Sequence, residues 1–296
     1  MINGLVLGSV YGLIAIGYTM VYGIIGMINF AHGEIYMISA YLFAIFLAMM
    51  GMFGINSLPV ALLLTLVFTV VITGLYGFAV ERMAYRPLRG SPRLAPLISA
   101  IGMSIVLQNY VQLAQGANDQ VVPPLWEGVF RVGSESDYMQ ITYIQLVIIL
   151  ATIASMAALT YLISKTPLGR ACRATQQDIT MANLLGINTD RIISLVFVIG
   201  ASMAAVAGVL ITLNFGSFNF FIGFIAGIKA FTAAVLGGIG SLPGAMLGGI
   251  ILGLSESLFA GFVNTDYKDV FAFALLVAVL IFRPTGILGR PEVEKI

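Results

Sequence analysis

The sequence predicts an all-α polytopic integral membrane protein, and three observations support this class. Of the 296 residues, 59% are hydrophobic. Only 9% are charged, against about 25% in ordinary soluble domains. The charged residues are clustered, and long charge-free stretches separate the clusters. A soluble enzyme, a nucleic-acid-binding protein or a disordered chain needs far more charge at its surface, so these classes are excluded.

The charge-free stretches predict where the chain crosses the membrane. They are continuously apolar and do not alternate, which favours helices over a closed barrel. We expect about nine spanning helices (range about eight to ten) of about 20 apolar residues each, within one transmembrane domain of residues 1–296. The expected spans lie near 1–33, 35–52, 58–80, 94–118, 138–164, 192–213, 220–236, 244–262 and 270–282.

The arginine and lysine residues predict the orientation of the chain. Loops 81–93 and 165–191 and the C-terminal tail are basic, so we expect them in the cytoplasm. We assign the arginines of 81–93 no role beyond topology. Loop 119–137 is mostly acidic and should lie outside, which places the N-terminus outside if residues 1–33 cross once. The Gly-rich segment 23–33 predicts a broken or re-entrant piece within that first span.

The chain lacks the motifs that catalysis or a cofactor would need. It has no Gly-x-x-x-x-Gly-Lys-Ser/Thr sequence, which excludes ATP hydrolysis by a P-loop. A single histidine and a single cysteine exclude a His-His metal motif and an intramolecular disulfide. We therefore expect no enzymatic activity and no metal or cofactor on this chain. The net charge of +1 also implies no nucleic-acid partner.

The cytoplasmic segment 165–191 is the most informative part of the sequence. Residues 170–185 predict an amphipathic helix that Gly186 can end in the left-handed conformation, and Asn188 or Thr189 should cap the next helix. Such a helix can lie on lipid, pack on the bundle or dock on a partner. A simple connector would not need four helical turns, which favours docking. The expected docking residues are Arg170, Arg173, Ala174, Asp178, Ala182 and Gly186.

Several polar residues occur within or between the predicted spans. Asn29, His32 and Glu34 either belong to a translocation path or form a helix break at the membrane face. Gln108, Asn109 and Gln112 suggest either hydrogen bonds between helices or a pore lining.

A second break is predicted between two of the later spans. An inward-facing turn is expected to contain Gly237, Gly238, Gly240, Ser241, Pro243 and Gly244. Lys229 and Glu256 are placed near span ends, where a lysine can extend its charge to water.

Several longer strings resemble the LivH-type permease of bacterial branched-chain amino acid ABC importers, and the resemblance covers essentially the whole chain. The strings are Asn3-Gly4-Leu5, Gly17-Tyr18-Thr19-Met20-Val21-Tyr22-Gly23, Asn29-Phe30-Ala31-His32-Gly33-Glu34, Ile98-Ser99-Ala100-Ile101-Gly102-Met103-Ser104, Leu185-Gly186-Ile187-Asn188-Thr189-Asp190-Arg191 and Leu236-Gly237-Gly238-Ile239-Gly240-Ser241-Leu242-Pro243-Gly244-Ala245.

The resemblance implies a permease of the bacterial inner membrane with the fold of the larger importers, a compact bundle with an internal pseudo-repeat. It implies a second related permease, two ATPase subunits that bind ATP and magnesium, and a periplasmic amino-acid-binding protein. The coupling helix would lie at about 168–188, although the usual Glu-Ala-Ala string is missing. The Gly-rich breaks before Gly33 and Pro243-Gly244 suggest the repeat.

Three alternatives remain open from the sequence. A permease of the same class could carry another small cargo, such as an amide, urea or a sugar. A self-sufficient secondary transporter would need a buried acidic residue for its coupling ion, for which Glu34 and Glu256 are the candidates. A membrane scaffold that transports nothing is the third alternative, but it would not need a helix at 170–185.

Overall fold

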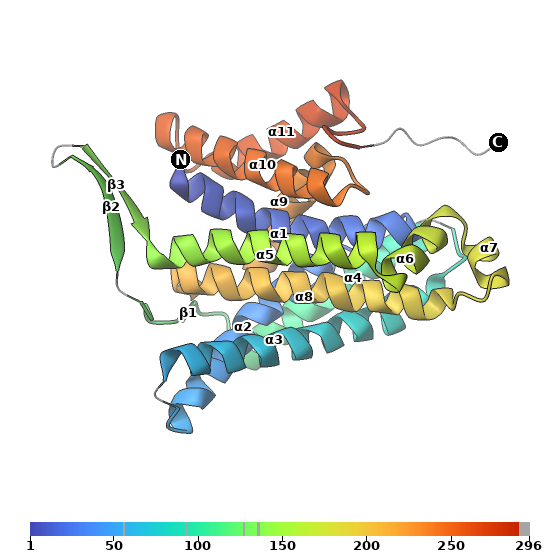
Figure 1. Ribbon diagram of the computed structural model, residues 1–296, viewed down its shortest axis with the longest axis horizontal. Coiled ribbons are helices and arrows are strands. Elements are labelled where there is room, and N and C mark those ends of the chain that lie inside the picture. The colour runs from blue at the N-terminus through green and yellow to red at the C-terminus, as the bar shows by residue number, and fades with distance from the viewer. Residues whose placement is uncertain (56, 93, 127, 135–136, 290–296) are drawn as a thin grey trace.

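The structure is a computed structural model that describes residues 1–289, apart from residues 56, 93, 127, 135 and 136. Its long helices run roughly along one common direction (Figure 1). The N-terminus lies at the same end as a hairpin of strands β2 (Val129–Ser134) and β3 (Asp137–Thr142). Helices α6 (Pro167–Gln177) and α7 (Ile179–Leu184) lie at the opposite end. The bundle therefore has two distinct ends, as a membrane-spanning protein requires.

Seven helical segments in the described part of the chain are long and apolar enough to cross a membrane. They are α1 (Ile2–Ile25), α2 (His32–Met52), α3 with its extension (Leu58–Leu88), α4 (Leu94–Gln115), α5 (Tyr143–Lys165), α8 (Thr189–Phe215) and α10 (Leu242–Phe262).

Two further apolar helices are shorter. Helix α9 (Ile222–Gly237) has 16 residues and α11 (Lys268–Phe282) has 15. At about 1.5 Å per residue they extend about 22–24 Å, less than the hydrocarbon thickness of about 30 Å. Length and composition thus support a multi-pass membrane protein with seven spans among the described residues. The predicted count of nine depends on these two short helices.

The outer loop departs from the all-α prediction. Strands β2 and β3 pair antiparallel, with Val129 opposite Thr142 and Ser134 opposite Asp137. Strand β1 (Gln120–Val121) pairs antiparallel with β4 (Ser217–Phe218). These strands lie outside the apolar helices, where water can hydrogen-bond the open edges of a sheet. The prediction holds for the apolar part of the chain and is wrong for this loop.

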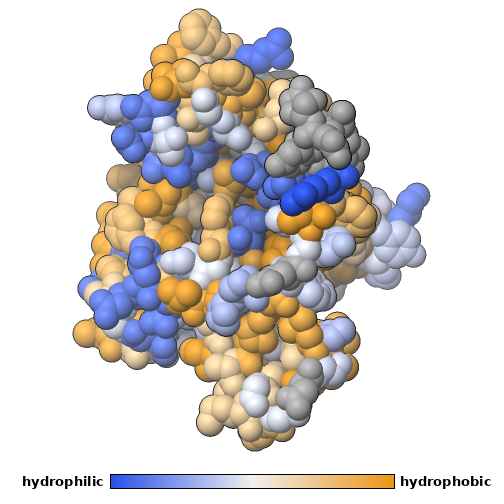
Figure 2. All heavy atoms as spheres, turned by 90° about the vertical axis from the view of Figure 1, so that its left-hand side faces the viewer, coloured by the Kyte–Doolittle hydropathy of each residue, from blue (hydrophilic) through white to orange (hydrophobic). Residues whose placement is uncertain are grey.

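Contacts at the two ends show which loops lie together. Arg86 and Arg89 of the basic loop both form ion pairs with Asp190, so loop 81–93 lies beside the start of α8. At the other end, the Gln145 amide donates to the side chain of Asn3 over 2.9 Å. Figure 2 views this end and shows hydrophilic residues distributed across it. The basic segments therefore gather at one end, which we call the cytoplasmic end.

Small residues allow α1 and α10 to pack closely. A Cβ on Gly8 would lie only 2.7 Å from Cα of Ile250 and 2.8 Å from the carbonyl oxygen of Gly249. Similar overlaps would occur along the rest of this contact, at Gly4, Gly12 and Gly253. Glycine at every fourth position gives each helix one flat face, which lets two backbones approach in lipid. The glycine excess of the sequence is used here for packing.

The chain repeats one backbone motif 190 residues later. Gly26 after α1 and Gly216 after α8 both take the left-handed conformation, with φ of 70° and 65°. In each break, the carbonyl of Asn29 or Asn219 accepts the first N–H of the next helix, at 3.0 and 3.3 Å. The sequence predicted that the break before Gly33 is repeated at Pro243-Gly244. The structure instead repeats it at Gly216, before α9.

The two helices that follow these breaks meet inside the bundle. A Cβ on Gly33 of α2 would overlap the carbonyl of Gly223 and would lie 2.8 Å from Cα of Gly227, both in α9. Helix α1 runs toward the cytoplasmic end and α8 runs away from it (Figure 1). The breaks thus enter the bundle from opposite ends, and the first turns of α2 and α9 come into contact.

Candidate functional site

The cytoplasmic segment forms two helices where one was predicted. Helix α6 ends at Gln177 and α7 begins at Ile179, because Asp178 takes an extended conformation between them. Its carboxylate accepts the N–H of Met181 at 3.0 Å, so the residue caps α7. Aspartate favours such a cap over a helix interior, since its side chain competes for backbone N–H groups. The prediction of one continuous helix over 170–185 is wrong for this reason.

Helix α6 packs on the bundle through one face. Its buried residues are Gly169, Cys172 and Thr175, while Arg170 and Arg173 are exposed and Ala174 is half-buried. Burial raises the pKa of the Cys172 thiol, which therefore stays neutral and acts as a packed apolar group. The Arg173 guanidinium donates to the Ile163 carbonyl of α5, so Arg170 is the arginine of α6 that stays free of the bundle.

Helix α7 presents apolar side chains away from the bundle. Ala182 is its buried residue, whereas Leu184 and Leu185 are 76% and 80% exposed. Ile179 and Met181 are also exposed. A contiguous set of exposed large apolar side chains next to a basic surface is typical of a protein contact site.

Gly186 follows α7 in the left-handed conformation, with φ of 83°. A Cβ at this position would meet no atom within 4 Å, so the space above it is open. It belongs to an open polar groove of about 440 Å³ lined by Asn183, Gly186, Ile187, Asn188, Thr189 and Asp190. The backbone conformation, and not the available space, therefore favours glycine here.

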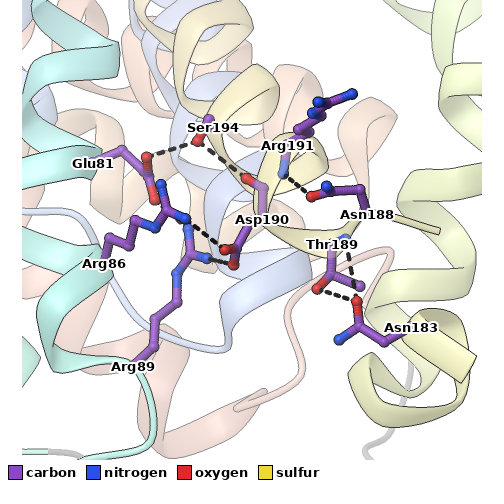
Figure 3. Close-up of polar contacts among 9 residues, drawn as sticks. All are labelled: Glu81, Arg86, Arg89, Asn183, Asn188, Thr189, Asp190, Arg191 and Ser194. Carbon is purple, nitrogen blue, oxygen red and sulfur yellow. Dashed lines mark hydrogen bonds and ion pairs between the residues drawn. The ribbon is translucent and has the colours of Figure 1, made fainter. Parts of the chain in front are cut away.

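Side-chain hydrogen bonds join α7 to α8 (Figure 3). The Thr189 hydroxyl donates to the side-chain oxygen of Asn183 at 2.9 Å. The side chain of Asn188 accepts the N–H of Arg191 at 3.0 Å and caps α8, which confirms the predicted cap. A displacement of α7 would therefore reach the first turn of α8 directly.

A charge cluster connects α8 to the end of α3 (Figure 3). Arg89 contacts both Asp190 and the fully buried Glu81, and Arg86 contacts Asp190 at 2.7 Å. The Ser194 hydroxyl donates to Glu81 at 2.7 Å. Sequence reasoning missed this cluster, because it treated the arginines as topology signals only.

The backbone supports this cluster. Beyond Val80 the helix α3 continues through a π-turn, η1 (Glu81–Tyr85), and a 3₁₀ turn, η2 (Arg86–Leu88), where a loop was expected. A π-turn inserts one extra residue into a helix and often marks a functional position. The continuation carries both arginines to Asp190.

The polar residues predicted near the first break are buried in the bundle. Asn29, His32 and Glu34 are each 1% exposed, and the last two lie in the first turn of α2. The Tyr85 hydroxyl donates to the side chain of Asn29 at 2.9 Å, and the Ser104 hydroxyl donates to Glu34 at 3.1 Å. Asn29 does lie in the helix break after α1, but the burial of all three residues contradicts a loop exposed at the membrane face.

Helix α4 extends this polar region toward the outer end. Gln108 and Gln112 are half-buried and follow Ser104 at spacings of four, so the three share one face. Asn109 is exposed, and its amide donates to the Ile105 carbonyl at 2.8 Å. Neither glutamine side chain hydrogen-bonds to another residue in the described part of the chain. Among the residues that the structure describes, the predicted hydrogen bonds between helices are thus not formed.

The second predicted break lies at the cytoplasmic end. Helix α9 ends at Gly237, and Gly238 and Gly240 have positive φ. The Ser241 hydroxyl accepts the N–H of Gly244 at 3.2 Å, and Pro243 lies in the first turn of α10. The N–H of Leu288 donates to the Gly237 carbonyl at 2.9 Å. The turn is thus covered by the chain that follows α11.

Lys229 and Glu256 lie inside the bundle, which corrects the prediction that they occupy span ends. The Lys229 ammonium lies 2.7 Å from Glu256 and 2.5 Å from Asp269. The side chains of Lys229 and Glu256 are only 4% and 3% exposed. One cation thus joins α9, α10 and α11. No group of three or more potential metal ligands occurs among the described residues.

These features define a class of protein: a multi-pass helical membrane protein with exposed apolar side chains at one end and a polar region inside the bundle. The model of a family described as branched-chain amino acid transport system, permease component, matches residues 1–280. The chain therefore belongs to this family. It is a transporter component of the bacterial inner membrane and not a catalytic subunit.

Curated relatives match along the whole chain. The high-affinity branched-chain amino acid transport system permease protein LivH of Escherichia coli (strain K12) is 58% identical over 100% of this chain and 96% of its own length. The permease protein BraD of Pseudomonas aeruginosa is 57% identical over 100% of this chain and 97% of its own.

A more distant relative has a different name. The permease protein LivM of Escherichia coli (strain K12) is 29% identical over 97% of this chain and 70% of its own length. No solved structure matches the chain.

Proposed function

We propose that this chain is the permease subunit of an ABC importer that moves leucine, isoleucine and valine across the inner membrane by alternating access. The observation that carries the proposal is the identity of 57–58% over the full length to relatives named for branched-chain amino acid transport. The cargo is a zwitterion with an apolar side chain. A bundle with abundant apolar surface and few charges suits its passage, because a high density of charge would bind it too tightly.

The proposed assembly contains a second permease, two ATPase subunits and a periplasmic binding protein. Similarity to LivM, a second permease protein of Escherichia coli, supports the pairing of two related permeases. ATP and magnesium would bind to the ATPase subunits, and no cofactor or metal would bind to this chain. Selectivity would reside mainly in the binding protein.

The coupling surface of this chain would be the segment 168–188. The exposed side chains of α7 would remain in contact with water unless another protein covered them, and an ATPase groove is the expected cover. Motion would pass from α7 to α8 through Thr189 and Asn188, and from α8 to α3 through Asp190. Gly186 would let the chain turn without strain beside the docked surface.

The translocation path would follow the polar face of α4. Glu34, Ser104, Gln108 and Gln112 form a polar line from the first turn of α2 toward the outer end. Unpaired amides facing lipid are costly, so this face would border either water or the second permease. The path would then run between the two permeases. All nine apolar helices would cross the membrane, including the shorter α9 and α11.

Uptake in a reconstituted importer tests the proposal. The chain would be co-expressed with the subunits that co-purify with it, and radiolabelled leucine uptake would be measured in vesicles with ATP inside. We expect isoleucine and valine to compete with leucine, and urea, acetamide and ribose not to compete. Competition by one of the latter would identify another cargo, and uptake by the chain without ATPases would identify a secondary transporter.

A further inference from the structure

A groove at the cytoplasmic end, between α3 and α8, shares Asp190 with the proposed coupling path, but its apolar wall has no role in the proposed transport mechanism. It has a volume of about 510 Å³. Its lining includes three apolar side chains and three arginines, which are Phe78, Leu195, Val198, Arg82, Arg86 and Arg191. Polar residues complete it, among them Asp190, whose carboxylate is paired with Arg86. A groove with apolar walls and basic residues at one end is the pattern that an amphiphilic anion requires.

The apolar and basic residues are arranged in the same order on both helices. On α3, exposed Val71, Leu75 and Phe78 lie on one face, and Arg82 follows at the cytoplasmic end. On α8, Arg191, Leu195 and Val198 follow at spacings of four and three, again on one face. With a rise of about 1.5 Å per residue, Val198 lies about 10 Å deeper than Arg191.

The apolar residues are accessible from outside the chain. Leu75, Phe78 and Leu195 are 58%, 41% and 44% exposed. Only 28% of the most apolar window of α3 is buried within this chain, so most of the helix faces its surroundings. The groove therefore continues into the apolar surface of α3 and does not end in a closed cavity.

The arginines differ in whether they have partners. Arg86 forms an ion pair with Asp190 at 2.7 Å. Neither Arg82 nor Arg191 forms an ion pair with any residue that the structure describes. Two free cations thus border an apolar groove at the predicted boundary between the cytoplasm and the membrane.

We propose that this groove binds an anionic phospholipid of the cytoplasmic leaflet, such as phosphatidylglycerol. The phosphate lies at Arg82 and Arg191, and one acyl chain lies over Phe78, Leu195 and the exposed face of α3. Charge complementarity favours this ligand over a zwitterionic lipid, because the two unpaired cations need a net negative charge. The acyl chain uses the apolar wall, which inorganic phosphate would leave uncovered.

Quenching by brominated lipid tests the proposal in the full chain together with the subunits that co-purify with it. The single tryptophan, Trp126, lies in the outer loop and is replaced by phenylalanine. Phe78→Trp then places a fluorophore in the groove. Phe68→Trp is the matched control, because Phe68 lies on the same helix, is 47% exposed and does not line the groove.

We expect brominated phosphatidylglycerol to quench Trp at position 78 at a much lower mole fraction than brominated phosphatidylcholine, and to show no such preference at position 68. Replacing either Arg82 or Arg191 with glutamine should lower the preference roughly fivefold, and replacing both should remove it. Lys165→Gln, which removes an exposed cation at the end of α5 outside the groove, should leave it unchanged.

Three results would overturn the proposal. Equal quenching by the two lipids at position 78 would show an ordinary lipid-facing surface. A preference that survives loss of both arginines would mean that the anion binds elsewhere. Absence of quenching by either lipid at position 78 would show that a protein subunit covers the groove. None of these results depends on which cargo the importer carries.

Discussion

Replacing Lys229 tests whether the buried ion pairs hold the C-terminal helices together. Lys229 contacts Glu256 at 2.7 Å and Asp269 at 2.5 Å, and the hydroxyl of Tyr11 lies 3.4 Å away. Lys229→Met keeps an unbranched side chain, one atom shorter, and removes its charge. Glu256 would then remain in the bundle as an uncompensated anion, which is the costly outcome for a buried pair.

The expected loss follows from this burial. Removing one partner of a buried ion pair costs about 3–5 kcal/mol. In a chain of this size each kcal/mol lowers the melting temperature by about 2–4 °C, so Lys229→Met should lower it by about 10 °C. The double variant Lys229→Met with Glu256→Gln should recover much of the loss, because the remaining anion, Asp269, has a side chain that is 38% exposed.

Thermal unfolding of the purified chain in one detergent, followed by circular dichroism, measures these shifts. Lys165→Met is the control, since Lys165 is exposed at the end of α5 and forms no ion pair with a described residue. Its melting temperature should stay within about 1–2 °C of the unchanged chain. If Lys229→Met lowers the melting temperature as little as Lys165→Met does, the lysine extends to water as the sequence suggested. The buried contacts of Lys229 with Glu256 and Asp269 would then not form in the membrane protein.

Two further predictions concern glycines. Gly186→Val should lower leucine uptake while the protein still inserts, because a φ of 83° costs an L-residue about 1–2 kcal/mol. Asparagine tolerates this conformation, so Gly186→Asn should retain more uptake than Gly186→Val. Normal uptake by Gly186→Val would show that this position has no part in coupling. Gly33→Leu should separate α2 from α9 and reduce the yield of monodisperse protein in size-exclusion chromatography, since its Cβ would lie 2.8 Å from Cα of Gly227. Gly51→Leu, where a Cβ meets nothing within 4 Å, should have little effect, and equal yields would contradict the close contact.

Features that depend on composition and on near neighbours could be predicted from the sequence. The Asn188 cap was predicted correctly, because a cap requires only a side chain and an N–H three residues away. The turn before α10 lies where glycine and proline place it. The grouping of basic loops at one end follows from counting charges.

Features that depend on contacts between distant residues could not be predicted. Asp178 divides the cytoplasmic segment into two helices, although the apolar spacing favoured one. Glu81 appeared to be an isolated acid in a basic loop, yet it lies beside Arg89 and Ser194, the latter 113 residues away. The break before Gly33 was expected to repeat at Pro243-Gly244, because Gly33 and Pro243-Gly244 both follow glycine-rich sequence. The same left-handed turn occurs instead at Gly216.

The sequence alone determined that the chain is a multi-pass membrane protein, and it predicted a basic cytoplasmic side and a segment suited to docking. Hydropathy and charge are sums over short windows, so they report where a helix crosses and on which side its loops lie. Tertiary structure alone decided which polar groups are buried together, such as Lys229 with Glu256 and Glu34 with Ser104. The physical reason is that a window average carries no information about the rotation of a helix, and rotation decides whether a side chain faces lipid, water or a partner on another helix.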